Sequence, residues 1–166
     1  MKDYEFAEGK TGRTVFVRVK AGADLVKCVK EAFEKSGFTV ASVSIAIGSL
    51  RKIRFVFVNE DGRYTSPVEK EGMFELISAG GFLSRVSGKI ETHIHFAFAD
   101  NEGKVFGGHM LEEGNIVYAT AEIRIDEIEG VEIAKSFDRE TNFTMFKVRP
   151  KKTANKSFWK FCTFSL

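Results

Sequence analysis

All three histidines of this 166-residue chain lie in one stretch, HIHFAFADNEGKVFGGH, between residues 93 and 109. They are His93, His95 and His109, and imidazole is the commonest transition-metal ligand among protein side chains. Three imidazoles that meet at one point can bind zinc or another divalent transition metal and leave one coordination position open. The cluster therefore predicts a metal site, and the alternative is a pocket of hydrogen-bonded histidines without metal.

The strand pattern around the histidines decides whether their rings can meet. In ETHIHFAFA alternate residues share a face, so His93 and His95 point the same way while the apolar residues between them face the core. A three-residue loop at 101–103 would place His95 opposite His109. A four-residue loop would put His109 on the other face unless a bulge at 107–108 restores it. Convergence of the rings is therefore an expectation that depends on the loop.

Carboxylates near the histidines are candidates for a fourth ligand or a general base. Glu75, Glu112 and Glu113 can supply a fourth ligand, as can another subunit. Glu91 shares strand parity with His93, which makes it the first candidate for a general base. An open position on a three-histidine zinc beside such a base is the arrangement of a metal-dependent hydrolase or lyase. That enzyme is the alternative function, and its open position would bind a small molecule.

The rest of the sequence favours strands, with a single helix. RTVFVRVK at 13–20 alternates apolar and polar residues as a half-buried strand does. A helix is expected at about 24–36, with Asp24 as its N-terminal cap or in its first turn and Gly37 at its end. The later segments read as strands and turns, and a bulge or bend is expected at 80–81. The pattern predicts an α+β fold with a mainly antiparallel β-sheet that curls into a barrel or sandwich.

The domain is expected to span residues 1–150, because Pro150 is followed by the polar, basic spacer KKTANK. The segment 151–166 then forms a basic and aromatic C-terminal tail that contains the only tryptophan. Aromatic side chains at a terminus favour burial, so this tail is expected to dock on its own domain or on a neighbouring subunit, and the alternative is a loosely ordered tail.

Composition limits the classes of protein to which the chain can belong. Apolar residues make up 43% and charged residues 29%, which is typical of a globular domain. Cys28 and Cys162 form no disulfide framework, and no apolar run has the length of a signal peptide or membrane span, so we expect a cytoplasmic protein without membrane contact. A net charge of +2 does not indicate a nucleic-acid partner, but a local patch could still bind phosphates. The candidate basic residues for such a patch are at 51, 52, 54, 147, 149, 151 and 152.

Five stretches resemble the PPC ("plants and prokaryotes conserved") domain family, in its prokaryotic stand-alone form. They are GADLVKCV, IAIGSL, GMFELISAGG, HIHFAFADNEGKVFGGHML and VYATAEI, and the resemblance covers about residues 13–148. It implies an α+β fold, a homotrimer, and a metal held by His93, His95 and His109. It also implies a DNA-binding or regulatory role with a DNA or protein partner, as in the related plant AT-hook nuclear proteins.

Two features depart from the plant members of that family. The chain has no Arg-Gly-Arg-Pro core of an AT-hook, so it lacks the motif with which the plant proteins would bind the DNA minor groove. Met73 stands where the plant partner-binding segment, which resembles Gly-Arg-Phe-Glu, has arginine. The expected function is therefore that of a trimeric metal-binding PPC-domain protein with a DNA-binding or regulatory role, without these two plant features.

Overall fold

The computed structural model describes residues 4–151, which form one helix and eight strands. In chain order these elements are β1 (Lys10–Lys20), α1 (Leu25–Ser36), β2 (Val40–Val56), β3 (Val68–Val86), β4 (Lys89–Asp100), β5 (Val105–Met110), β6 (Ile116–Glu129), β7 (Val131–Asp138) and β8 (Phe143–Pro150). The predicted α+β class is confirmed. Within the described residues no helix is long and apolar enough to cross a membrane.

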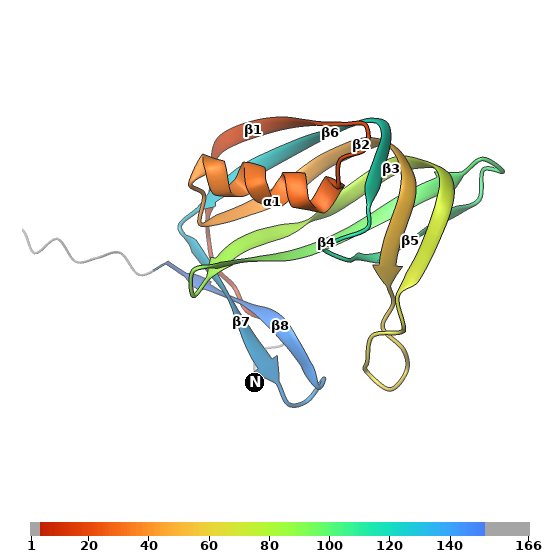
Figure 1. Cartoon of the computed structure of the whole chain (residues 1–166). Coiled ribbons are helices and arrows are strands. Elements are labelled where there is room, and N and C mark those ends of the chain that lie inside the picture. Colours follow the sequence, from red (N-terminus) through yellow and green to blue (C-terminus); the bar gives the residue numbers. More distant parts are fainter. Residues whose placement is uncertain (1–3, 152–166) are drawn as a thin grey trace, which may run out of the picture.

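Six strands form one antiparallel sheet in the order β1-β6-β2-β3-β4-β5. The end of β2 also pairs with β5, through Phe55 with Met110 and Val56 with His109. This second pairing partly closes the sheet without making a complete barrel. Strands β7 and β8 form a separate hairpin. Figure 1 shows α1 against one side of the curved sheet, while the hairpin and the segment joining β2 to β3 extend away from it.

Helix α1 begins and ends where its capping residues predict. The Asp24 side chain accepts hydrogen bonds from the backbone N–H groups of Val26 and Lys27, which have no partner inside the helix. Gly37 follows the helix in the left-handed conformation, with φ of 73°. The second Asp24 oxygen accepts from Gly114 N–H at 2.7 Å, so the same carboxylate ties the helix to the segment that follows β5.

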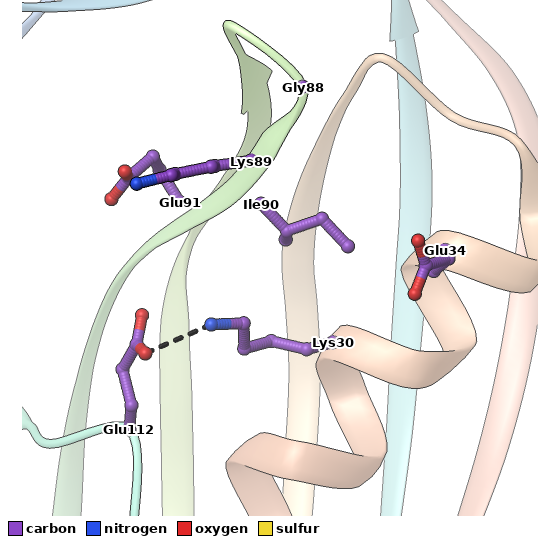
Figure 2. Close-up of a pocket in the computed structure, with 7 residues that line it drawn as sticks. All are labelled: Lys30, Glu34, Gly88, Lys89, Ile90, Glu91 and Glu112. Carbon is purple, nitrogen blue, oxygen red and sulfur yellow. Dashed lines mark hydrogen bonds and ion pairs between the residues drawn. The ribbon is translucent and has the colours of Figure 1, made fainter.

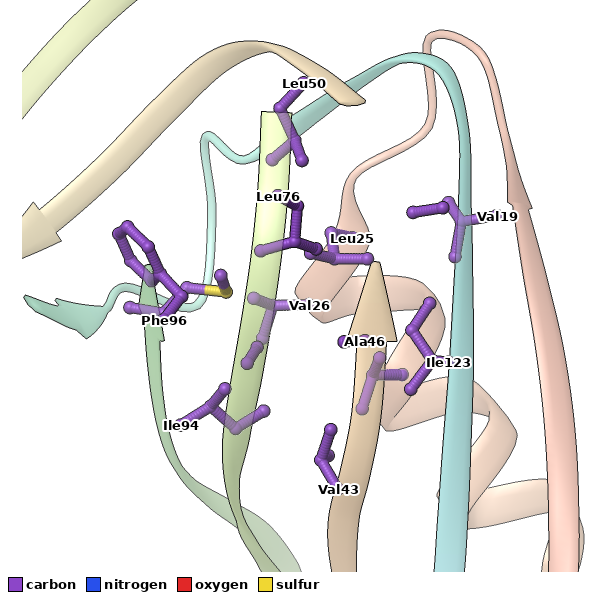
Figure 3. Close-up of a cluster of buried hydrophobic side chains, with 14 of the residues drawn as sticks. Val19, Leu25, Val26, Val43, Ala46, Leu50, Leu76, Ile94, Phe96 and Ile123 are labelled. Carbon is purple, nitrogen blue, oxygen red and sulfur yellow. The ribbon is translucent and has the colours of Figure 1, made fainter. Parts of the chain in front are cut away.

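The core lies between α1 and the sheet. Leu25 and Val26 project from the helix toward Val43, Ala46 and side chains of β1, β3, β4 and β6 (Figure 3). Burying one such side chain contributes about 1.5–3 kcal/mol, so this face of the sheet is the main source of stability. We call the opposite face, on which Phe16, Ile45 and His95 are exposed, the outer face. Its side chains are accessible to ligands and to other protein chains.

One detail of the strands differs from the expectations. The pairing of β3 with β4 is continuous through the glycine pair at 80–81, where a bulge or bend was expected, and its register shifts between Leu76 and Ser78 instead. Gly81 is instead a point of close approach, because a Cβ there would collide with the carbonyl oxygen of His93 on β4. The absence of a side chain at Gly81 allows β3 to pair closely with β4, the strand that carries His93 and His95, without a bulge.

The close approach at Gly81 can be tested by substitution, with Gly80 as the matched control. Gly81→Ala should lower the free energy of unfolding by about 2 kcal/mol or more, since a methyl group has no room against backbone. Gly80→Ala should be nearly neutral, because its Cβ would have only the Val43 carbonyl oxygen nearby, at 3.9 Å. Urea denaturation of both variants measures the difference, and equal midpoints would contradict the close-approach argument.

Strand β8 ends at Pro150, where the domain was expected to end. The tail proposed to dock at 151–166 lies, beyond Lys151, outside the described residues.

Candidate metal centre

The loop between β4 and β5 has the three-residue form that brings the histidine strands together. Asp100 N–H donates to Lys104 C=O at 3.1 Å, and Gly103 N–H donates to Asp100 C=O at 3.0 Å. The resulting register pairs His95 with His109. Gly103 has φ of 79°, the left-handed conformation that closes such a loop. The expectation that depended on loop length is therefore met.

The histidine rings lie on the outer face of β4 and β5. Ile94, Phe96 and Phe98 are buried on the other side, so the alternation expected for this strand is confirmed. No bulge is needed at 107–108. A Cβ at Gly107 would collide with the carbonyl oxygen of Phe96, which shows that this glycine allows β5 to lie close against β4.

The ring nitrogens converge. His93 Nε2 lies 3.0 Å from His95 Nε2, and His109 Nδ1 lies 3.3 Å from the same nitrogen. One ligand atom from each residue falls within 4.8 Å of the others. Two nitrogens bound at 2.0–2.1 Å to a tetrahedral zinc stand about 3.3–3.4 Å apart. The donor set and its spacing therefore fit a transition-metal ion with small ring movements.

The electrostatics of the cluster favour neutral imidazoles. Burial, the neighbouring His93 and His95 rings and the Lys135 ammonium lower the pKa of His109 from 6.5 to about 4. Burial, His95 and Lys135 also lower the pKa of His93. A neutral ring offers its nitrogen lone pair to a metal without first losing a proton, so these two side chains are ready as ligands at neutral pH.

Aromatic rings from two other segments flank the histidines. Tyr64, from the segment joining β2 to β3, lies 5.2 Å from the His109 ring centre. Phe146 of β8 lies 5.9 Å from the ring centre of His93. Tyr64 also contacts Phe143 of β8 at 5.4 Å, so the two extensions visible in Figure 1 touch beside the cluster.

These flanking residues could not be found from the sequence. Phe146 belongs to a segment predicted only as a strand, and nothing local in a strand tells which surface its hairpin will cover. Tyr64 follows the turn signal NEDG and carries no spacing relation to the histidines. The position of Lys135 beside Glu91 could not be predicted either, because it depends on how the β7–β8 hairpin packs on the sheet.

None of the four carboxylates considered as ligands or base belongs to the donor group of this cluster. Glu91 forms an ion pair with Lys135 of β7, at 2.5 Å. Glu112 and Glu113 pair with lysines of α1, at 2.9 and 3.2 Å, and Glu75 is exposed on β3. Among the described residues, the group with metal-binding geometry contains the three histidines alone.

A surface hollow of about 450 Å³ lies on the helix side of β4, away from the histidines. Lys30 and Glu34 of α1 face Ile90 across it, and Lys30 pairs with Glu112 (Figure 2). The hollow is open to solvent, and most of its lining is charged side chains, of which Lys30 and Glu112 pair with each other. We therefore place the candidate site at the histidine cluster, which has the convergent donors that the hollow lacks.

The predicted basic patch is largely neutralised by ion pairs. Lys52 pairs with Glu69 and Glu71, at 2.6 and 3.4 Å, and Arg54 lies 3.8 Å from Glu69. On the hairpin, Lys147 pairs with Glu5 and Asp138, and Arg149 pairs with Glu132. These cations would have to exchange a carboxylate for a phosphate, which weakens the electrostatic case for nucleic acid.

Comparison with known families matches residues 6–129 to the Plants and Prokaryotes Conserved (PCC) domain. The chain belongs to this family. The match covers the sheet, α1 and the histidine hairpin, so it confirms the family indicated by the sequence motifs. It ends before the β7–β8 hairpin, which contributes Phe146 and Lys135.

Solved structures share the fold of this PPC-family chain. A metal-containing protein from Archaeoglobus fulgidus has a TM-score of 0.77 at 26% identity, over 87% of this chain and 99% of its own. A plant- and prokaryote-conserved protein from Pyrococcus horikoshii has a TM-score of 0.72 at 30% identity, over 87% and 97%. A candidate DNA-binding protein from Bacteroides thetaiotaomicron has a TM-score of 0.71 at 15% identity, over 84% and 96%, and shows the fold alone. Curated proteins give no match.

The depressed pKa of His109 predicts how the metal-free protein responds to acid. Below pH 6.5 the unfolded chain binds a proton on His109, whereas the folded chain keeps the ring neutral down to about pH 4. Stability should therefore fall as the pH drops through this window, because the unfolded state binds more protons. Urea denaturation with a chelator present should show a smaller loss between pH 7 and 5 for His109→Asn than for wild type. Parallel stability curves would contradict the expected contribution of this residue.

Proposed function

We propose that this PPC-domain protein binds one divalent transition metal ion, zinc in the first place, through His93, His95 and His109. The observation that carries the proposal is the convergence of three imidazole nitrogens within 4.8 Å on the outer face of the sheet. Zinc suits an all-imidazole set, and the other first-row divalent ions are bound by the same donors. The metal-containing relative from Archaeoglobus fulgidus supports a metal in this fold.

Three protein ligands leave one coordination position for a ligand from solution. When bound, the metal supplies a Lewis-acid centre that attracts an electron-rich donor atom. The hydrolase or lyase alternative also needs a general base at the reacting atom. Glu91, the first candidate, is held in an ion pair by Lys135, so the observations favour ligand binding over turnover.

Elemental analysis of untagged protein tests the metal site. Wild type should carry near-stoichiometric metal, and His93→Ala and His109→Ala should each lose most of it, because two imidazoles hold a metal far less tightly than three. Glu91→Gln is the matched control on the same strand and should keep its metal, since Glu91 is outside the donor group. An affinity tag of histidines is avoided because it binds the same ions.

Two outcomes would contradict the proposal. Absence of metal after reconstitution with zinc, cobalt and nickel would leave the cluster as a hydrogen-bonded pocket. Metal that is retained in both alanine variants would place the site elsewhere in the chain.

We propose further that the protein acts as a homotrimer, as the family resemblance implies. Support comes from large apolar side chains that remain exposed on the outer face of the sheet, on strands β1, β2, β3 and β6. These are Phe16, Ile45, Ile47, Phe82 and Tyr118, and Phe16 is 79% exposed. Phe16 and Ile45 lie on either side of Arg124 in the strand register. A surface of this kind favours association with other copies of the chain.

Sedimentation velocity tests the assembly. Wild type should sediment with three times the 18.6 kDa mass of one chain, and Ile45→Lys should shift it to the monomer by placing a charge in the contact. Phe137→Lys is the control, because Phe137 is also exposed but lies on the β7–β8 hairpin. A monomeric wild type, or a trimer unaffected by Ile45→Lys, would overturn the proposed interface.

A DNA-binding or regulatory role stays an expectation of the family resemblance. The ion pairs of Lys52, Arg54, Lys147 and Arg149 give it no added support in a single chain. A trimer would gather three copies of any weak cationic surface, which can act together on a phosphate backbone. Metal binding is therefore the function that we place first, and the cytoplasmic location stays a prediction.

A further inference from the structure

We infer that the β7–β8 hairpin and the segment joining β2 to β3 complete the histidine centre as a binding site for a small carboxylate with an apolar body. In this arrangement the carboxylate occupies the open metal position and accepts a hydrogen bond from Lys135. The inference rests on the proposed metal site and names the class of ligand that the site takes.

Although the hairpin projects from the sheet, its base packs on the outer face, so the side chains there have defined places. Ile133 and Val148 pack in a small apolar cluster with Val40, and Ser84 Oγ donates to Ile133 C=O at 2.8 Å. Lys135 is two residues beyond Ile133 and therefore shares its face. The hairpin thus presents Lys135 on the side that packs against the sheet.

Lys135 and Phe146 form one cross-strand pair beside the histidines. They are register partners, and the Lys135 ammonium lies 5.7 Å from the Phe146 ring centre. That ring lies 5.9 Å from His93. The same ammonium pairs with Glu91, which lies two residues before His93 on the same face of β4. The structure therefore places one cation on the side of the cluster where His93 lies.

The charges of the centre favour an anion. A divalent ion held by three neutral imidazoles keeps its full charge, because imidazole contributes none. Among the described residues no carboxylate joins the donor group, and Glu91 already neutralises Lys135. An anionic oxygen ligand would offset the metal charge. The Lys135 ammonium has three N–H donors, so it could donate one charge-assisted hydrogen bond to that ligand while it stays paired with Glu91.

The aromatic rings select a carboxylate over a wholly polar oxyanion. Tyr64 and Phe146 lie against different histidines, and Phe143 joins Tyr64 to the hairpin. A ligand bound to the metal would therefore lie near aromatic rings as well as the cation. A flat apolar group is stabilised by such contacts, whereas phosphate has no apolar part.

Cobalt-substituted protein provides a readout that does not depend on any activity. The visible absorption of bound Co²⁺ changes when a new ligand enters its coordination shell. Titration with benzoate should give a saturable change, and acetate should bind more weakly because it lacks the ring. Inorganic phosphate is the third probe and should bind more weakly than benzoate.

Variants assign the parts of the site. Lys135→Met combined with Glu91→Gln removes both members of the ion pair, and should weaken benzoate binding about tenfold or more with unchanged cobalt affinity. Lys147→Met is the matched control, because Lys147 is the neighbour of Phe146 on β8 and faces the other way. Tyr64→Ala, at a side chain that is 49% exposed, should reduce the preference for benzoate over acetate.

The outcomes separate this inference from the proposed function. Failure of the wild type to bind cobalt would overturn the metal site itself. Cobalt binding with no spectral change on adding benzoate, with phosphate bound more tightly, or with equal benzoate affinity in the Lys135 and Glu91 double variant would overturn the carboxylate site and leave the metal site standing.

Discussion

The antiparallel pairing of β4 with β5 is the constraint on which the candidate site depends. A three-residue loop closed by Gly103 sets the register, and the register places His109 opposite His95. A shift of one residue would turn His109 toward the core, where a charged or metal-bound ring could not be accommodated. Gly107 allows the backbones of β4 and β5 to lie close together. The pairing that brings the histidine rings together therefore leaves no room for a larger residue at position 107.

The stability of this arrangement comes from the other face of the sheet. Helix α1 covers the core face, and Asp24 links the helix start to the segment after β5 through Gly114. Asn115, which is fully buried, accepts from Arg54 N–H and donates to Leu111 C=O, so it joins the end of β5 to β2. Buried polar groups that have all their hydrogen-bond partners favour one arrangement of the chain, because other arrangements would leave buried donors or acceptors without partners. These contacts on the core side of the sheet thus hold β4 and β5, the strands that carry the histidines, in place.

Local rules were enough to predict the helix, the strand parity of His93 and His95, and the facing of His109 once the loop length was chosen. Each depends on residues fewer than about twenty positions apart. The flanking Tyr64, Phe146 and Lys135 were missed because their positions depend on the packing of a separate hairpin and a long connection. The irregularity in β3 was misplaced for a related reason. Glycine pairs signal both bulges and close approach, and only the partner strand distinguishes the two.

The outer face carries both the histidine cluster and the exposed apolar residues proposed to form the subunit interface. Phe82 of β3, one of its exposed apolar residues, is the register partner of His93. An interface that covered Phe82 would remove water from one side of the histidine centre, and the attraction between a metal ion and an anionic ligand strengthens as water is excluded. Assembly would then tighten ligand binding at the metal, and by reciprocity a bound ligand would stabilise the assembly. Coupling of this kind is one physical basis for a regulatory role, and it requires no basic surface for DNA.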